Sequence, residues 1–256
     1  MGRTVLISGA SSGFGRACAK RFAEAGDRLI LLARRKERLE ALAAELGRPE
    51  DIQLLVCDVT DAGALENAIK SLKAPFDAPD VLINNAGLAL GLETADKADI
   101  RDWETMIQTN VMALVRMTRL ILPGMVERDR GHIINVGSTA GNWPYPGGNV
   151  YGATKAFVKQ FSRELRSDVL GKKIKVTNIE PGMAETEFSL VRFKHNSEQA
   201  GRVYDGTRPL SPEDIADIIF WVCNTPPHVN INAMEIMPLC QAWGPFAISR
   251  DMEYND

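Results

Sequence analysis

Short apolar runs alternate along the chain with longer stretches of mixed polarity. The runs are four or five residues long and rich in β-branched side chains, which is typical of buried parallel strands. We therefore expect seven strands, of which the last is the least regular. They cover residues 4–8, 29–33, 53–57, 81–84, 132–136, 175–179 and 233–237.

The stretches between these runs are amphipathic and long enough for helices. Asp61 and Ser211 stand at N-cap positions, and Pro212 stands at a first helical position. The alternation of strand and helix predicts an α/β fold, a single-domain Rossmann-type doubly wound parallel sheet with helices on both faces. The expected helices cover residues 15–25, 36–46, 62–72, 102–128, 150–170 and 212–223.

One segment, residues 183–208, breaks this alternation. It is long, polar and irregular, and long loops of this kind are usually lids or binding loops. The sequence contains no internal repeat, low-complexity tract or Gly/Ser linker. We therefore expect one domain over residues 1–256, with a loop insertion around 183–208 and a C-terminal tail around 238–256.

Composition and charge exclude several classes of protein. The net charge of −3, from 30 basic and 33 acidic residues, gives no basic field for binding nucleic acid. No apolar run approaches the roughly 20 residues that span a bilayer, and no signal-peptide pattern precedes the first strand. The four cysteines and three histidines are scattered, so we expect reduced thiols, no metal site and a cytoplasmic protein.

A glycine-rich loop follows the first predicted strand and precedes a helix. Glycine leaves no Cβ where a chain turns tightly against a phosphate, and the helix N-terminus offers free N–H groups to a pyrophosphate. A glycine trio alone is weak evidence because loops are rich in glycine, but its place between a strand and a helix supports a dinucleotide site. The candidate contacts are Gly9, Ser11, Ser12, Gly13, Phe14 and Gly15.

Two cations, Arg34 and Arg35, follow the second predicted strand, where an acidic residue would bind the ribose 2′-hydroxyl of NAD. Arginine at this place accommodates the 2′-phosphate of NADP. The alternative is a solvated helix start, although cations are electrostatically misplaced at a helix N-terminus unless an anion joins them. Asp58 and Val59 follow the third strand, where the carboxylate either accepts hydrogen bonds from adenine or serves as a turn or N-cap.

Tyr151 and Lys155 lie four residues apart in a predicted helix and so share one face. An ammonium beside a phenol favours the phenolate and lowers the phenol pKa, so that the tyrosine can exchange a proton with an alcohol or carbonyl oxygen. Such a pair is more often a pair of surface residues, and the rest of the chain decides between the two interpretations. Ser138, just past a strand end, is a candidate for polarising a carbonyl, or else a turn serine.

These elements together resemble the short-chain dehydrogenase/reductase family over essentially the whole chain. They occur in the order and at the spacing of the family, with one departure: Ser8 stands where the family usually has Thr, and the hydroxyl is retained. The matching elements are Gly9/Gly13/Gly15, Asp58, Asn84-Asn85-Ala86-Gly87, Asn110, Ser138, Tyr151-x3-Lys155 and Pro181-Gly182.

The resemblance implies an enzyme in which NADPH delivers hydride to a carbonyl carbon while Tyr151 gives its proton to the oxygen. It implies that Lys155 tunes Tyr151 and binds the nicotinamide ribose, and that Asn110 holds a water that relays protons to the lysine. It further implies that the cofactor lies against Asn85, Ala86 and Gly87, that Pro181-Gly182 and Thr186 contact the nicotinamide amide and the pyrophosphate, and that the protein is a homotetramer.

Finer runs resemble the bacterial NADP-dependent 3-hydroxy acid dehydrogenases, which act on serine, allo-threonine and 3-hydroxypropionate. They include Trp143-Pro144-Tyr145 and Val191-Arg192-Phe193-Lys194. We expect a small acidic alcohol or aldehyde as substrate, its acidic end bound by Arg192 with the help of Lys194. Alternatively, Arg192 is a solvated arginine or binds a neighbouring subunit. Gln241 and Trp243 are candidates for completing the pocket.

Other functions stay open from the sequence. Closely similar reductases act on sulfoacetaldehyde, giving isethionate. A carbonyl reductase for bulkier substrates such as steroids or acyl thioesters fits less well with the polar segment Arg192-Phe193-Lys194-His195. A NADP-sensing regulator would be indicated by loss of the tyrosine or lysine, and both residues are present.

Overall fold

The computed structural model describes residues 2–194 and 196–243, and within them the strands form one parallel sheet in the order β3-β2-β1-β4-β5-β6-β7. The expected seven-stranded doubly wound sheet is therefore confirmed. Each strand lies within two residues of its predicted bounds. The strands are β1 Thr4–Ser8, β2 Arg28–Ala33, β3 Ile52–Val56, β4 Val81–Asn84, β5 Gly131–Val136, β6 Ile174–Pro181 and β7 Ala233–Ile236.

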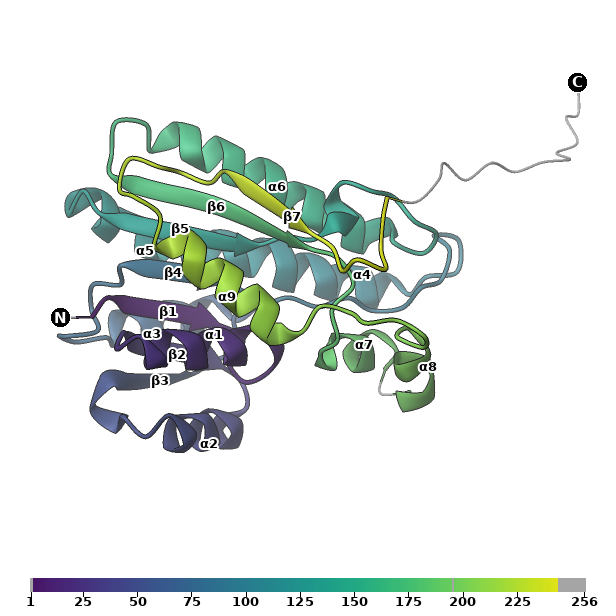
Figure 1. The fold of residues 1–256 in the computed structure, drawn as a ribbon, viewed down its shortest axis with the longest axis horizontal. Helices are drawn as coiled ribbons and strands as arrows, with labels where there is room; N and C mark the ends of the chain where they lie inside the picture. The colour runs from purple at the N-terminus through teal and green to yellow at the C-terminus, as the bar shows by residue number, and fades with distance from the viewer. Residues whose placement is uncertain (1, 195, 244–256) are drawn as a thin grey trace, which may run out of the picture.

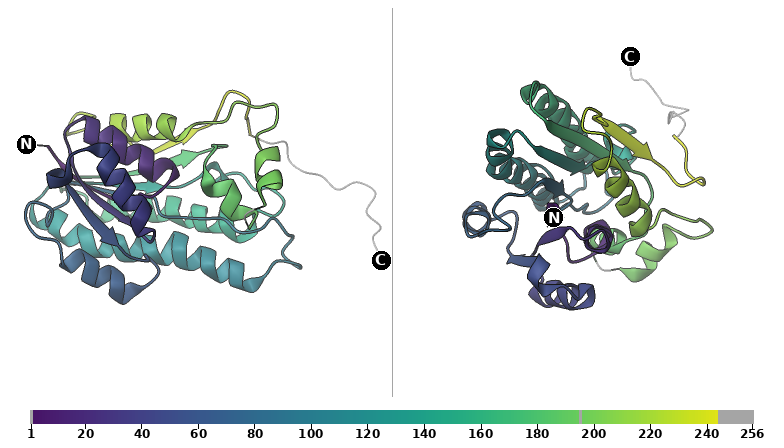
Figure 2. Two further views of the ribbon diagram at one scale, coloured as in Figure 1. Left: turned by 90° about the horizontal axis from the view of Figure 1, so that it is seen from below. Right: turned by 60° about the vertical axis from the view of Figure 1, so that its left-hand side comes forward.

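Helices cover both faces of the sheet (Figures 1 and 2). Side chains of α1, α2 and α9 pack on one face in a single apolar cluster, and side chains of α3, α5 and α6 pack on the other in a second cluster. Successive residues of β1 contribute to opposite clusters, as the pleat of a strand requires. The helices named here are α1 Gly13–Glu24, α2 Lys36–Leu46, α3 Ala62–Lys70, α5 Ala113–Glu127, α6 Asn149–Asp168 and α9 Pro212–Cys223.

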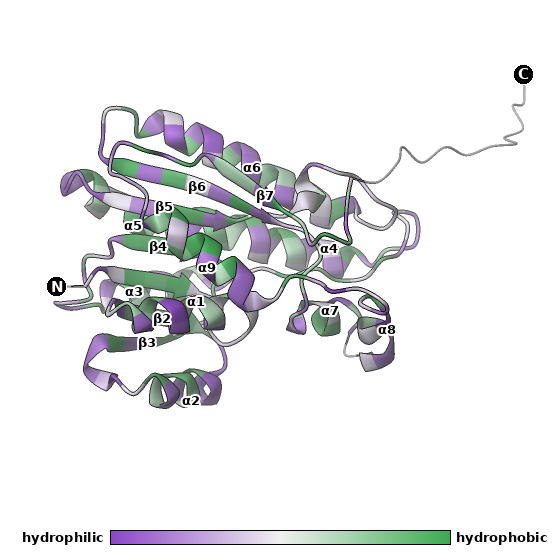
Figure 3. Ribbon diagram, viewed as in Figure 1, coloured by the Kyte–Doolittle hydropathy of each residue, from purple (hydrophilic) through white to green (hydrophobic). Residues whose placement is uncertain are grey.

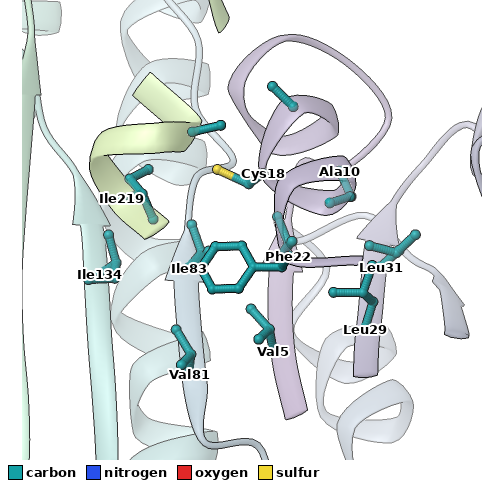
Figure 4. Close-up of a cluster of buried hydrophobic side chains, with 14 of the residues drawn as sticks. Val5, Ala10, Cys18, Phe22, Leu29, Leu31, Val81, Ile83, Ile134 and Ile219 are labelled. Carbon is teal, nitrogen blue, oxygen red and sulfur yellow. The ribbon is translucent and has the colours of Figure 1, made fainter. Parts of the chain in front are cut away.

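The first cluster is centred on Phe22 of α1, which is fully buried against strand residues such as Val5 and Ile83 (Figure 4). The hydropathy colouring shows the same division, because the central strands are largely apolar and the outward faces of the helices are polar (Figure 3). No helix in the described residues is long and apolar enough to span a membrane.

The predicted caps are present. The Asp61 carboxylate accepts a hydrogen bond from the Ala64 N–H and begins α3. Ser211 and Asp214 form a capping box at the start of α9, with Pro212 at its first position. Both helices therefore begin where the sequence places them.

Two predictions about the elements were wrong. The single helix expected over residues 102–128 is interrupted: α4 Ile100–Ile107 leads into a π-helical turn, Gln108–Met112, before α5 begins. The segment 183–208, expected to be irregular, contains α7 Glu187–Arg192 and α8 Ser197–Arg202. Each helix begins at a side-chain cap, provided by Thr186 and Asn196, and such caps allow helices of only six residues to form.

The strand order reverses between β1 and β4, and in open α/β sheets ligands bind at such a point, outside the carboxyl ends of the strands. In Figure 1, α7 and α8 stand beyond these strand ends, to the right of the sheet. The fold thus places the segment 183–208 over the region where a ligand is expected.

Candidate active site

A cleft of about 1000 Å³ opens at the carboxyl ends of the strands. Its wall contains residues from both halves of the sheet and from α7, so it joins the glycine loop to the tyrosine and lysine that lie far along the chain. Two of the predicted site residues, Gly15 and Asn110, do not line it. The predicted residues in its wall are Gly9, Ser11, Ser12, Gly13, Phe14, Arg34, Arg35, Asp58, Val59, Asn85, Ala86, Gly87, Ser138, Tyr151, Lys155, Pro181, Gly182, Thr186 and Arg192.

The glycine loop has the geometry that a closely approaching ligand requires. Gly13 adopts a φ of +51°, which favours glycine, and begins α1. A Cβ at Gly15 would lie 2.4 Å from the carbonyl oxygen of Gly9, so only glycine fits there. The loop therefore folds tightly onto the N-terminus of a twelve-residue helix, whose free N–H groups suit the pyrophosphate of a dinucleotide.

The Ser8 hydroxyl fixes this loop to β4. It accepts hydrogen bonds from the backbone N–H groups of Asn85 and Ala86, at 3.0 and 3.1 Å. The Asn85 amide in turn donates to the carbonyl oxygens of Ser8 and Gly9. A serine thus supplies the hydroxyl at the place where the family usually has threonine.

Three charged residues surround the end of the cleft where the sequence predicts the adenosine of a dinucleotide. Arg35 donates hydrogen bonds to the hydroxyls of Ser11 and Ser12, and Arg34 lies 3.6 Å from the Asp58 carboxylate. Partial burial raises the pKa of Asp58, but hydrogen bonds from Thr60 and the Arg34 charge outweigh it and hold that pKa below its usual value. Cations and serine hydroxyls together suit a phosphate at this position.

Tyr151 and Ser138 lie at the opposite end of the cleft. Tyr151 is buried near the start of α6, against Phe188 of α7, with ring centroids 5.5 Å apart. The Ser138 hydroxyl accepts a hydrogen bond from the Ala140 N–H and donates a long one, 3.4 Å, to the Pro181 carbonyl oxygen. Ser138 is also the N-cap of a short 3-10 turn, so the turn interpretation is confirmed, while its role in polarising a carbonyl stays a prediction.

Lys155 lies in the wall at this end of the cleft, and Asn110 is buried behind the wall. The Lys155 ammonium donates to the Val136 carbonyl oxygen at 2.8 Å and lies 5.9 Å from the centre of the Tyr151 ring. Asn110 is buried in the π-helical turn, where its side chain exchanges two hydrogen bonds with the backbone of Leu88. A Cβ at Gly87 would lie 3.2 Å from Asn110 Oδ1 and 3.5 Å from Lys155 Nζ, so these groups converge on one point.

The pKa of Tyr151 differs from the prediction. The sequence predicts that Lys155 lowers it, whereas burial raises the pKa of Tyr151 to about 12, with a smaller opposing effect from Ser138. The reason is that the ammonium is directed to Val136 and not to the phenol oxygen. Burial also lowers the pKa of Lys155 to about 8. At neutral pH the phenol is therefore protonated.

Arg192, at the end of α7, extends to the same end of the cleft. Its guanidinium carbon lies 5.6 Å from the centre of the Tyr151 ring, and its Nη2 donates to the Tyr145 hydroxyl at 2.7 Å. Lys194 does not join it: the ammonium lies 2.9 Å from Asp102, and the residue is absent from the cleft wall. The pairing of Lys194 with the substrate was therefore wrong, because a carboxylate of α4 holds this cation elsewhere.

Several residues of the wall escaped the sequence analysis. Phe188 and Tyr145 flank Tyr151, and Glu187 pairs with Arg35. Tyr145 stands in a run that carries the family resemblance, but no site role was predicted for it, and single aromatic or acidic residues in an expected loop carry no distinctive spacing. Gln241 and Trp243, expected in the pocket, do line it, and Gln241 accepts a hydrogen bond from the Met183 N–H. The rest of the tail, residues 244–256, and His195 lie outside the described residues.

The described residues contain no cluster of three or more metal-binding side chains. The wall of the cleft contains a phenol, an ammonium, serine hydroxyls and a glycine-rich loop. Residues 3–196 match the family model described as short chain dehydrogenase. The chain belongs to the short-chain dehydrogenase family.

This short-chain dehydrogenase is 55% identical over 247 residues to the NADP-dependent 3-hydroxy acid dehydrogenase of Salmonella typhi, covering 96% of this chain and 99% of that one. It is 49% identical to sulfoacetaldehyde reductase 2 of Chromohalobacter salexigens, over 98% of this chain and all of that one. Its fold matches a closed form of serine dehydrogenase complexed with NADP+, with a TM-score of 0.95 and 51% identity over 97% of this chain and all of that chain.

These similarities confirm the predicted family, the fold and an oxidoreductase acting on CH–OH groups. They also confirm the predicted cofactor class, because the similar proteins are named as NADP-dependent or were solved with NADP(H). The individual roles of the site residues and the homotetramer stay predictions.

Proposed function

We propose that the protein is an NADP(H)-dependent oxidoreductase that transfers hydride between nicotinamide and a small 3-hydroxy acid or the corresponding acidic aldehyde. The observation that carries this proposal is the position of Arg192, a cation in the same wall as the Tyr151 phenol and 5.6 Å from its ring centre. A small substrate with a carbonyl at one end and an acid group at the other can face both residues at once. The names of the similar enzymes support the same substrate class.

The residues present fit NADP(H). The tight glycine loop and the helix N-terminus suit the pyrophosphate, and Arg34 and Arg35 with the Ser11 hydroxyl suit the 2′-phosphate. In this arrangement Asp58 and Val59 would hold adenine, and residues 85–87 would lie against the cofactor. Thr186 would lie near the pyrophosphate, and Pro181 and Gly182 would contact the nicotinamide amide. When bound, the cofactor supplies the hydride.

The proton comes from Tyr151. The raised pKa keeps the phenol protonated at neutral pH, as a general acid for carbonyl reduction requires. Ser138 hydrogen-bonds the carbonyl oxygen and positions it for the phenol, while Lys155 binds the ribose. Asn110 holds the backbone of Leu88 and places its carboxamide beside Lys155, where it supports replenishment of the proton. In the oxidative direction Tyr151 acts as the base.

Arg192 selects an acidic substrate. Its guanidinium already donates to the Tyr145 hydroxyl and lies over both aromatic rings, so its orientation is set before a ligand arrives. A planar guanidinium matches a carboxylate by two hydrogen bonds. The segment 183–208 carries Arg192 and Phe188 over the reacting end, and we assign it the role of a substrate lid.

A second candidate, reduction of sulfoacetaldehyde, is favoured by the same arginine, because a sulfonate presents oxygens to a guanidinium as a carboxylate does. A regulator that merely senses NADP, or a reductase for bulky neutral substrates, does not account for an arginine fixed beside the proton donor.

The deciding experiment compares kcat/KM for NADPH-dependent reduction of malonic semialdehyde, sulfoacetaldehyde and a neutral short aldehyde. In the wild-type protein, kcat/KM should be higher for the two acidic aldehydes than for the neutral aldehyde. Arg192→Ala should lower kcat/KM for the acids about tenfold to a hundredfold and leave the neutral aldehyde nearly unchanged, because only a charged group loses its partner.

Arg202→Ala is the matched control, since Arg202 lies in the same segment, is exposed and pairs with Glu198. An equal loss on all substrates would indicate a lid defect. No loss on any substrate would remove Arg192 from the site.

A further inference from the structure

Glu187 lies in the wall of the cleft and belongs to the lid, the segment 183–208. Its carboxylate faces two arginines at the end of the cleft proposed for the cofactor. It is the first residue of α7, and its two carboxylate oxygens bind two different arginines of the second strand–helix junction. Oε2 lies 2.9 Å from Arg35 Nη1, and Oε1 lies 2.5 Å from Arg38 Nη1. The sequence separations are 152 and 149 residues, so these contacts exist only because the lid lies against the cofactor loop.

Arg35 is the link in this arrangement. Its Nε and Nη2 atoms donate to the hydroxyls of Ser11 and Ser12 in the glycine loop, while its Nη1 donates to Glu187. One guanidinium thus joins the loop that binds the cofactor to the helix that covers it. Thr186, directly before Glu187, lies against Gly13 of the same loop, so the base of the lid packs at this point.

We propose that Glu187 is a positioning residue that latches the lid shut by pairing with Arg35 and Arg38, and so slows release of NADP(H). The proposal rests on the proposed use of NADP(H), because the same arginine is assigned to the 2′-phosphate. The proposal also gives a role to Arg38, which has none in the proposed binding of cofactor and substrate or in the proton transfer.

The charges are compatible with simultaneous binding of phosphate and carboxylate. Arg34, Arg35 and Arg38 carry three positive charges, while Glu187 and Asp58 carry two negative ones. A phosphate dianion and Glu187 can share Arg35, because a guanidinium has five N–H donors and four of them are directed to protein atoms here, which leaves one for the phosphate beside the donors of Arg34.

The test uses Glu187→Gln, which removes the charge and keeps the size. Glu185→Gln is the matched control, because Glu185 lies two residues away, is exposed and enters no ion pair among the described residues. A second variant, Arg38→Gln, removes one side of the latch and leaves Arg34 and Arg35 for the phosphate.

Two measurements are needed. The first is hydrogen exchange of the lid, residues 183–208, in the protein without cofactor. The second is the NADPH dissociation rate, measured by stopped-flow fluorescence as NADPH is displaced by excess NADP+. Two half-exposed ion pairs at about 0.5 kcal/mol each correspond to about a fivefold change in the exchange of the lid and in the rate of NADPH dissociation.

We expect Glu187→Gln to raise lid exchange and NADPH dissociation by about fivefold, Arg38→Gln to raise both by about two- to threefold, and Glu185→Gln to leave both unchanged. The exchange result does not depend on the cofactor, so it tests the latch even if the protein fails to bind NADPH, which would overturn the proposed function instead. Unchanged exchange in Glu187→Gln would overturn the latch. Slower NADPH dissociation would overturn it too, because Glu187 would then be a competitor of the phosphate.

Discussion

At the scale of single residues, the proposed proton transfer depends on one phenol that burial keeps protonated. Burial raises the pKa of Tyr151 to about 12, and the phenol lies where Ser138 and Arg192 both influence it. A group that holds its proton at neutral pH is a suitable acid, and it becomes a base only when the reaction draws that proton away. The burial that positions Tyr151 therefore also sets its protonation state.

Tyr151→Phe removes this proton and should lower kcat for reduction by at least about a hundredfold, the low end for general acid catalysis. NADPH affinity, measured by fluorescence titration, should hardly change, because the ring still packs on Phe188. Tyr145→Phe is the comparison variant: it also loses one hydroxyl from the same wall, but that hydroxyl holds Arg192, so it should raise KM for acidic substrates and leave kcat nearly unchanged. Near-normal turnover in Tyr151→Phe would show that the proton comes from another group.

The lowered pKa of Lys155 gives a pH prediction. Burial lowers it from 10.5 to about 8, so the ammonium is charged below pH 8 and neutral above it. If the charged form serves catalysis, kcat/KM for reduction should be flat on the acidic side and fall as pH rises through about 8.

Lys155→Arg provides the control for this profile. Arginine stays charged throughout, so the fall near pH 8 should disappear from the variant even though its activity is lower. A wild-type profile that stays flat well above that pH would mean that the charge of Lys155 is not required.

At the scale of the elements, the parts predicted well are those with a strong period. Strand β1 is found at Thr4–Ser8 and helix α2 at Lys36–Leu46, as expected, because buried strands and amphipathic helices show a regular pattern of apolar residues along their whole length. The interruption at Asn110 does not change that pattern. A π-helical turn adds one residue to a helix without changing its apolar character, and such turns are frequent at functional sites.

The site shows the same limit. The glycine loop, Tyr151 and Lys155 were predictable because their spacing is dictated by a turn and by a helix face. The pairing of Lys194 with Asp102, and of Glu187 with Arg35, was not, since each joins residues far apart in sequence through the path of the lid. Charge alone indicates that a residue needs a partner, but only the fold determines which partner is near.

One element prediction concerns stability. Ser211→Ala removes the N-cap of α9, whose buried residues Ile215 and Ile219 belong to the first cluster. The free energy of unfolding should fall by about 1 kcal/mol, measured by urea denaturation. Ser167→Ala, at an exposed position inside α6, is the control and should change it little. An equal effect of both would mean that the cap does not stabilise the native helix.

At the scale of the whole molecule, the wall of the cleft contains elements from both halves of the sheet. A ligand that fills the cleft should therefore stabilise the whole protein against unfolding. A ligand that binds only the native state stabilises it by about 2.7 kcal/mol at a hundred times its Kd. For a chain of this length, that stabilisation corresponds to a rise in Tm of about 5–10 °C. Cofactor preference thus becomes measurable without any substrate.

NADPH at that concentration should therefore raise Tm by about 5–10 °C. NADH at the same concentration should give about half of that or less, because the lost charge-assisted contacts to the 2′-phosphate cost about 1.5–3 kcal/mol. Arg34→Ser combined with Arg35→Ser should reduce the NADPH shift to that of NADH, since both arginines line the cleft and Arg35 donates to the Ser11 hydroxyl. Lys36→Ser is the control, because this neighbouring cation pairs with Glu40 and lies outside the cleft wall. Equal shifts by the two cofactors in wild type would show that neither arginine distinguishes them.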